Sequence, residues 1–221
     1  MHEFFVSGSD GSVRARWLAF EGLIDLRCEE TAIRAIEKVL QIELPRQANR
    51  YLGDGERSAF WMAPLHWLLR LPEHEESALV AKLAKFSNEA GPCEDKLEGD
   101  GTFEGDDKAE SVRRVDGVDT GADQSCGHAA ITVVSDAYIG IRLEGLAATR
   151  VLSAGCPLDF SRLGPGCCAR TLLARAQVMV IVLEQGSGYE ILVERSHSDY
   201  VQQWITVAVS ASTTDAARGS V

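Results

Sequence analysis

A strongly acidic stretch in the middle of this 221-residue chain separates two more apolar parts. Between residues 89 and 123 there are twelve Asp or Glu and only four Lys or Arg, so this stretch carries −8 of the net charge of −11. A weakly apolar sequence with charge of one sign buries too little surface to offset the entropy lost on ordering. We therefore predict that residues 89–127 are a disordered insertion between two folded halves.

The first half, residues 14–88, shows a sequence of strand and helix signals. An apolar run over 17–27 indicates a strand, and acidic residues from Glu29 begin a helix with an apolar stripe. Two further apolar runs over 58–71 flank a turn and predict a hairpin. Pro72 then begins a second helix.

The second half, residues 128–209, repeats that order. The expected elements are strands over 128–134, 139–143, 171–183 and 189–194, a helix from 145 to near 155, and a last helix with Ser196 as its N-cap. Two β-α-β-β-α halves predict an α+β protein with mainly antiparallel sheets. The ends, residues 1–13 and 210–221, are expected to be flexible.

Composition excludes several classes of function. No apolar run approaches the roughly 18–20 residues that a membrane span needs, and the first residues do not resemble a signal peptide. We therefore expect a cytoplasmic protein whose six cysteines are reduced thiols. The acidic net charge argues against a nucleic-acid surface, which requires clustered Lys and Arg.

A turn containing Gly, Cys and Pro follows the helix of the second half. Gly155 is suited to end a helix, Pro157 prevents its continuation, and an apolar strand begins at Thr171. Cys156 could be a nucleophile, but no His and Asp arrangement can be assigned around it. We interpret Cys156 as a small buried apolar residue.

Three stretches resemble the gamma subunit of heterotetrameric sarcosine oxidase. They are Leu-Pro-Arg-Gln-Ala-Asn at 44–49 with the apolar run 59–69, Gly-Cys-Pro-Leu-Asp at 155–159 with Cys-Ala-Arg-Thr-Leu-Leu at 168–173, and Arg-Ser-His-Ser-Asp-Tyr at 195–200 with Trp204. One turn departs from the family pattern, because Ala63-Pro64-Leu65-His66 replaces Gly-Pro-Asp-Glu. This departure puts in doubt any folate-related role of that turn.

The resemblance implies a fold related to the amino-terminal part of the glycine-cleavage T-protein and other folate-binding aminomethyltransferases. It implies a complex with alpha, beta and delta subunits, in which the partners hold FAD, FMN, NAD, tetrahydrofolate and zinc and this chain alone holds no cofactor or metal. The chain would have no catalytic residues and would brace the catalytic subunits. The motif residues expected at the subunit interface are Gly155, Cys156, Pro157, Leu158, Asp159, Arg170, Thr171, Arg195, Ser196 and Trp204.

Sequence motifs for independent chemistry are weak. There is no Gly-x-Gly-x-x-Gly after a strand, no P-loop and no His-Glu-x-x-His. Cys126 and His128 could supply two zinc ligands, whereas zinc requires about four. Arg170 could contact a partner or face water. Three alternatives stay open: the equivalent subunit of an N-methylglutamate dehydrogenase-type complex, a free-standing folate-binding aminomethyltransferase-like protein, and an acidic scaffold that recruits a basic partner.

Overall fold

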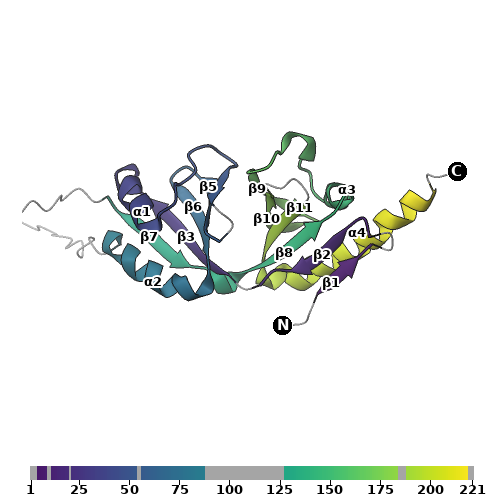
Figure 1. Ribbon diagram of the computed structural model, residues 1–221, viewed down its shortest axis with the longest axis horizontal. Coiled ribbons are helices and arrows are strands. Elements are labelled where there is room, and N and C mark those ends of the chain that lie inside the picture. The colour runs from purple at the N-terminus through teal and green to yellow at the C-terminus, as the bar shows by residue number, and fades with distance from the viewer. Residues whose placement is uncertain are drawn as a thin grey trace, which may run out of the picture.

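The computed structural model describes residues 4–8, 11–19, 21–53, 56–87, 127–183 and 188–218, with side chains described as far as residue 212. The expected insertion, residues 89–127, lies outside the described residues except for Gly127. Two antiparallel sheets lie in the middle of the molecule, and helices cover their outer faces (Figure 1). The predicted α+β class with mainly antiparallel sheets is confirmed.

The first sheet has five strands and carries its helices on one face. In spatial order its strands are β4 (Tyr51–Gly53), β5 (Ser58–Ala63), β6 (His66–Leu71), β3 (Gly22–Cys28) and β7 (Ala129–Val133). The helical elements on this side are η1 (Glu30–Ala32), α1 (Ile33–Leu40), α2 (Glu73–Leu83) and η2 (Ala84–Phe86). The predicted hairpin over 58–71 and the helix after Pro72 are confirmed.

The second sheet has six strands and a longer C-terminal helix. In spatial order its strands are β1 (Phe5–Ser7), β2 (Arg14–Trp17), β8 (Tyr138–Glu144), β11 (Gly188–Glu194), β10 (Ala176–Val182) and β9 (Cys168–Leu173). The helical elements of this half are η3 (Ser135–Ala137), α3 (Ala148–Ser153), η4 (Phe160–Arg162), η5 (Arg195–His197) and α4 (Ser198–Arg218).

Each half donates one strand to the sheet of the other half. Strand β2 precedes β3 along the chain but pairs with β8, and β7 precedes β8 but pairs with β3. The crossing segments are fixed by matching backbone bonds, from Leu18 N–H to Gly140 O and from Val134 N–H to Leu23 O, each 2.8 Å long. The single strand expected over 17–27 is therefore wrong, because the chain changes sheets after Trp17.

Apolar periodicity explains how the helices of the first half attach. Ile33, Ile36 and Leu40 are spaced three and four residues apart and are all buried against the sheet. Helix α1 ends where Gln41 adopts a left-handed conformation with φ of 58°. Acidic residues in the first turn of α2 suit the positive end of its dipole.

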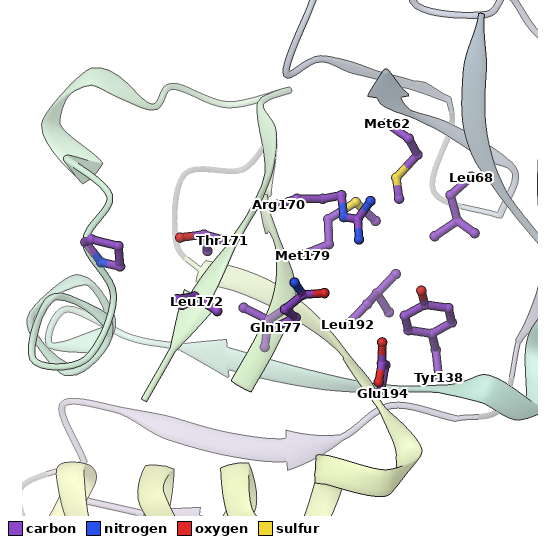
Figure 2. A pocket seen from close by; sticks show the side chains of 12 residues that line it. Met62, Leu68, Tyr138, Arg170, Thr171, Leu172, Gln177, Met179, Leu192 and Glu194 are labelled. Atoms are coloured by element: carbon purple, nitrogen blue, oxygen red, sulfur yellow. The ribbon is translucent and has the colours of Figure 1, made fainter. Parts of the chain in front are cut away.

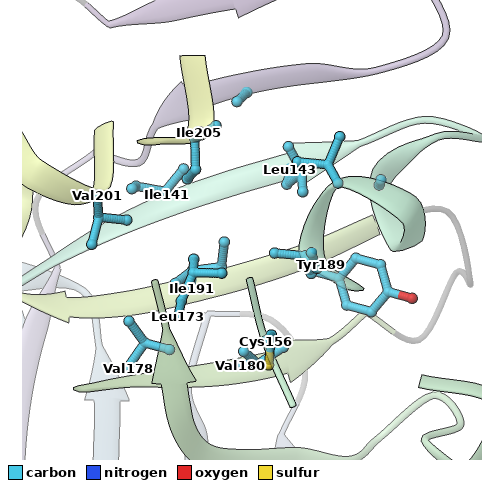
Figure 3. Close-up of a cluster of buried hydrophobic side chains, with 14 of the residues drawn as sticks. Ile141, Leu143, Cys156, Leu173, Val178, Val180, Tyr189, Ile191, Val201 and Ile205 are labelled. Carbon is cyan, nitrogen blue, oxygen red and sulfur yellow. The ribbon is translucent and has the colours of Figure 1, made fainter. Parts of the chain in front are cut away.

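A second apolar core lies between the second sheet and helices α3 and α4. Figure 3 shows Val201 and Ile205 of α4 over Ile141 of β8 and Ile191 of β11. Helix α4 continues to Arg218, with the Ser212 side chain buried, so the flexible tail expected from residue 210 is corrected over this range.

The N-terminal residues also belong to this second core. Phe4 and Val13 are buried, and β1 pairs with β2 from Phe5 to Ser7. Phe4 packs on Trp17 with ring centroids 5.3 Å apart. The flexible N-terminus expected over residues 1–13 is therefore corrected for these residues.

The strand expected over 171–183 is in fact a hairpin. Ala174 and Arg175 form a two-residue turn between β9 and β10, with φ of 49° and 81°. Positive φ at both central residues suits the right-handed twist of the flanking strands. Neither residue is Gly or Asn, which are the usual sequence signals of such a turn.

The inner faces of the two sheets meet in a third apolar cluster. Leu23, Phe60 and Leu68 from the first sheet pack near Met179 and Leu192 from the second. The two halves meet along this layer, with β5 and β6 of the first sheet facing β9 and β10 of the second (Figure 1). This contact places residues from both halves around one site.

Candidate functional site

The Gly-Cys-Pro turn forms a tightly packed corner against α4. A Cβ atom on Gly155 would lie 2.3 Å from Cζ2 of Trp204, so only glycine leaves room for the indole ring. The Ala174 N–H donates to Gly155 O over 2.9 Å, and the Tyr200 hydroxyl donates to Ala174 O. The structure therefore brings the motif residues Gly155 and Trp204 together with the β9–β10 turn.

Three further residues of the 155–159 turn have structural partners within the corner. Cys156 is buried and its Sγ lies 3.7 Å from Oγ1 of Thr171. Asp159 accepts hydrogen bonds from the backbone N–H and the hydroxyl of Ser161, which hold the pKa of the Asp159 carboxyl below its usual range. Leu158 is half-buried against the second core.

The third motif lies at the other end of the second sheet. Arg195 donates from Nε to Asp136 O over 2.8 Å, which ties η5 to η3. Ser196 lies inside η5 with its hydroxyl 3.2 Å from Nδ1 of His197. Helix α4 begins at Ser198, so the expectation that Ser196 is its N-cap is wrong.

An inter-sheet cleft of about 530 Å³ lies between the two halves. Figure 2 shows side chains from both sheets pointing into it, with Arg170 of β9 reaching toward Met62 of β5. Its walls are mostly apolar and its charged residues are few, as in many ligand and segment binding sites. The cleft is lined by Met62, Leu68, Tyr138, Pro157, Arg170, Thr171, Leu172, Gln177, Val178, Met179, Leu192 and Glu194.

Sequence reasoning identified only part of this cleft. Pro157, Arg170 and Thr171 were singled out, whereas Met62, Tyr138 and the β10 and β11 residues were not. The available signal was the continuous apolar run over 178–183, which is typical of a strand buried on both faces. That signal indicates a second packing surface but does not say which strands form its other side.

Beside the cleft, a buried ion network joins the two sheets. Glu190 of β11 binds Arg70 of β6 across the interface and Arg142 of β8 within its own sheet, the latter over 2.6 Å. Arg70 and Glu190 are almost fully buried, and the Arg70 guanidinium also stacks 5.2 Å from the Phe60 ring centre. Burial raises the pKa of the nearby Glu21 carboxyl. The network is a specific polar contact between the halves.

In the turn that departs from the family pattern, His66 pairs with an aspartate of β3. His66 Nε2 lies 2.7 Å from Asp25 Oδ2, and Arg27 lies 3.3 Å from the same carboxylate. Leu65 in this turn has φ of 58°. Within the described ranges, no three His, Cys, Asp or Glu side chains are grouped closely enough to hold a metal ion, and Cys126 lies outside those ranges.

Two of the buried thiols, Cys28 and Cys168, are poorly suited to nucleophilic chemistry. Burial raises the pKa of Cys168 to about 12 and that of Cys28 to about 11. Both thiols stay protonated near neutral pH, and the thiolate is the reactive form. Cys168 also donates toward Arg50 O over 3.4 Å, so its part is to join β9 to the start of β4.

Comparison with solved structures relates this fold to a known enzyme complex. The chain is similar to a chain of the heterotetrameric sarcosine oxidase from Corynebacterium sp. U-96, solved in complex with pyrrole 2-carboxylate, with a TM-score of 0.66. The likeness covers 91% of this chain and 85% of that one at 20% identity. The chain has the fold of a sarcosine oxidase subunit. No family model and no curated protein sequence matches it.

This likeness confirms, at the level of the fold, the resemblance to sarcosine oxidase that the three motifs indicated. Because the likeness covers 91% of this chain, it extends over both halves. Among the helices of the described residues, none combines the length and apolar character that a membrane crossing needs.

Proposed function

We propose that this chain is the gamma-type subunit of a heterotetrameric sarcosine oxidase and that it braces the catalytic subunits without supplying catalytic residues. The observation that carries the proposal is the shared fold, which extends over 91% of this chain. The motif residues support it, because Gly155 and Trp204 pack against each other and give the second half a defined shape. Such a shape suits a docking subunit.

The proposed complex oxidises sarcosine to glycine. The N-methyl group leaves as formaldehyde, or as methylenetetrahydrofolate when tetrahydrofolate accepts it, and oxygen is reduced to hydrogen peroxide. The proposal assigns FAD, FMN, NAD, tetrahydrofolate and zinc to the alpha, beta and delta partners in the cytoplasm. This chain then contributes contacts that hold those partners in position.

The decisive experiment co-expresses the tagged chain with the products of its neighbouring genes. The expected result is co-purification of three partners in one complex that produces hydrogen peroxide from sarcosine. A tagged chain that remains alone and monodisperse beside all of them would overturn the proposal. Omitting this chain is the matched control, and it should lower the yield of assembled complex.

The co-expressed complex and the isolated chain together test two of the alternative functions. Peroxide formation or dye reduction with N-methylglutamate but not with sarcosine would change the substrate and retain the subunit role. Calorimetry of the isolated chain with tetrahydrofolate tests a free-standing folate protein, for which measurable binding is required. We expect no heat of binding from the isolated chain.

A further inference from the structure

We propose that an extended segment of a partner subunit pairs with the outer edge of β9 and places its side chains in the inter-sheet cleft. The segment would add a seventh strand beside Arg170 and Leu172. This inference rests on the proposed function, because it requires a partner subunit. It goes further by naming the surface and the chemistry of the segment that binds there.

The backbone of β9 offers unpaired hydrogen-bonding groups at this edge. The two-residue turn makes Leu173 and Ala176 the first hydrogen-bonded pair of the hairpin. Because hydrogen-bonded pairs alternate along an antiparallel ladder, the backbone N–H and C=O of Thr171 also point toward β10. Arg170 and Leu172 must then direct their N–H and C=O groups outward. Outside the strand ladders, no backbone hydrogen bond among the described residues involves Arg170 or Leu172.

Contacts at the start of β9 verify this alternation. The Cys168 N–H points outward and donates to Asn49 O over 3.0 Å. The Tyr51 N–H likewise donates to Gly166 O over 3.1 Å. The residues just before β4 therefore cover the edge of β9 only as far as Cys168. The outward-facing backbone groups of Arg170 and Leu172 lie beyond this covered part.

The cleft continues from the inner face of the sheets to this edge. Met62 and Leu68 line it on the side of the first half, and Pro157, Arg170 and Leu172 line it on the side of the second. The Leu172 side chain is 46% exposed on this edge. A strand added here would place alternate side chains in the cleft, which suits a large apolar residue.

Charge defines the second property of the segment. Arg170 is exposed, and its guanidinium has no ion pair or hydrogen bond to any described residue. Figure 2 shows its side chain projecting over the cleft. A carboxylate would bind such a guanidinium through two hydrogen bonds. We therefore expect an Asp or Glu near the apolar residue of the partner segment.

The edge strand of the first half does not offer the same surface. Strand β4 has only three residues, and the N–H of Tyr51 is already bonded to Gly166. Charged residues on exposed edges can also prevent unwanted pairing. If Arg170 had only that protective role, reversing its charge would leave assembly of the complex unchanged.

The test uses the full co-expressed complex. Arg170→Glu should weaken capture of the partner subunits by roughly tenfold or more, because it places two carboxylates together. Arg34→Glu makes the same charge change at an exposed site in α1, outside the cleft, and should have no effect. Circular dichroism of each isolated variant checks that both remain folded.

Hydrogen–deuterium exchange tests the backbone pairing directly. On assembly, the amides of Arg170 and Leu172 should become protected, whereas the amide of Thr171 is bonded to β10 in both states. If the complex assembles but these two amides exchange unchanged and Arg170→Glu binds normally, the inference fails and the proposed function stands. If no partner is captured by the unmodified chain, both fail.

Discussion

The two halves of the chain follow one plan but present different surfaces. Strand order β4-β5-β6-β3-β7 in the first sheet corresponds to β9-β10-β11-β8-β2 in the second, with β1 added at the edge. The last strand of each series comes from the other half. The difference lies outside this shared frame: the first half has a three-residue edge strand, and the second has a six-residue edge beside the inter-sheet cleft.

The inner faces of the halves are complementary as well as similar. Strand β6 supplies Arg70 and strand β11 supplies Glu190, and these opposite charges meet in the apolar layer. The repeated plan thus accounts for the backbone, while a few residues that differ between the halves decide which surfaces meet.

The largest effect should come from separating the halves. Fragments 1–87 and 127–221 should each fail to unfold cooperatively when expressed alone, because the first sheet loses β7 and the second sheet loses β1 and β2. Co-expressed fragments should associate and recover a cooperative transition. Thermal unfolding followed by circular dichroism measures this outcome, and a cooperative transition of either single fragment would show that the halves are independent.

Removing the buried charge of the second half should be the next most damaging change. Glu190→Leu leaves Arg70 and Arg142 without their shared carboxylate, and such losses cost about 3–5 kcal/mol. Glu144→Leu is the control, since this exposed carboxylate lies 3.7 Å from Arg142. Urea unfolding measures both. Adding Arg70→Met to Glu190→Leu should restore much of the stability, and failure to do so would argue against the pairing across the sheets.

The corner of the second half should be sensitive to one added methyl group. Gly155→Ala forces the new Cβ against Trp204 and should lower the free energy of unfolding by about 1–3 kcal/mol. Gly164→Ala is the matched control, because no atom lies within 4 Å of its added Cβ. Equal unfolding midpoints for the two variants would contradict the packing described for this corner.

The smallest effect should be a pH-dependent one at Asp159. Hydrogen bonds from Ser161 lower the pKa of this carboxyl in the folded state relative to the unfolded state. The Asp159 carboxylate therefore makes its full contribution to the free energy of unfolding above the unfolded-state pKa of about 3.9. That contribution is lost as the pH falls through the lower pKa of the folded state. Asp159→Asn should be slightly less stable near neutral pH, and the difference should shrink in acid. A difference independent of pH would contradict this assignment.

Local sequence patterns were enough to predict most elements but not how they pair. The stripe of Ile33, Ile36 and Leu40 and the hairpin before Pro72 have clear periodic signals, and the structure confirms both. The exchange of β2 and β7 has no such signal, because an apolar strand does not specify its neighbour. The turn at Ala174 and Arg175 was not predicted because neither residue is Gly or Asn. Their positive φ angles are set by the pairing of β9 with β10.

The site shows the same division between local and long-range information. Gly155, Arg170 and Trp204 were recognised as motif residues from the sequence. Their contacts depend on long-range packing, as when Trp204 of the last helix fills the space left by Gly155. The cleft is lined in part by Met62 from the first half. A sequence pattern within the second half therefore could not predict which residues line it.

The exchange of strands makes the position of β7 independent of the length of the chain that precedes it. Strand β7 is held in place by its pairing with β3 from Ile24 to Cys28, and the Val134 N–H secures its far end. The geometry of the sheets is therefore set by strand pairing. The molecule resembles a strand-exchanged dimer joined into one chain, so its sheets tolerate a change of length at the join.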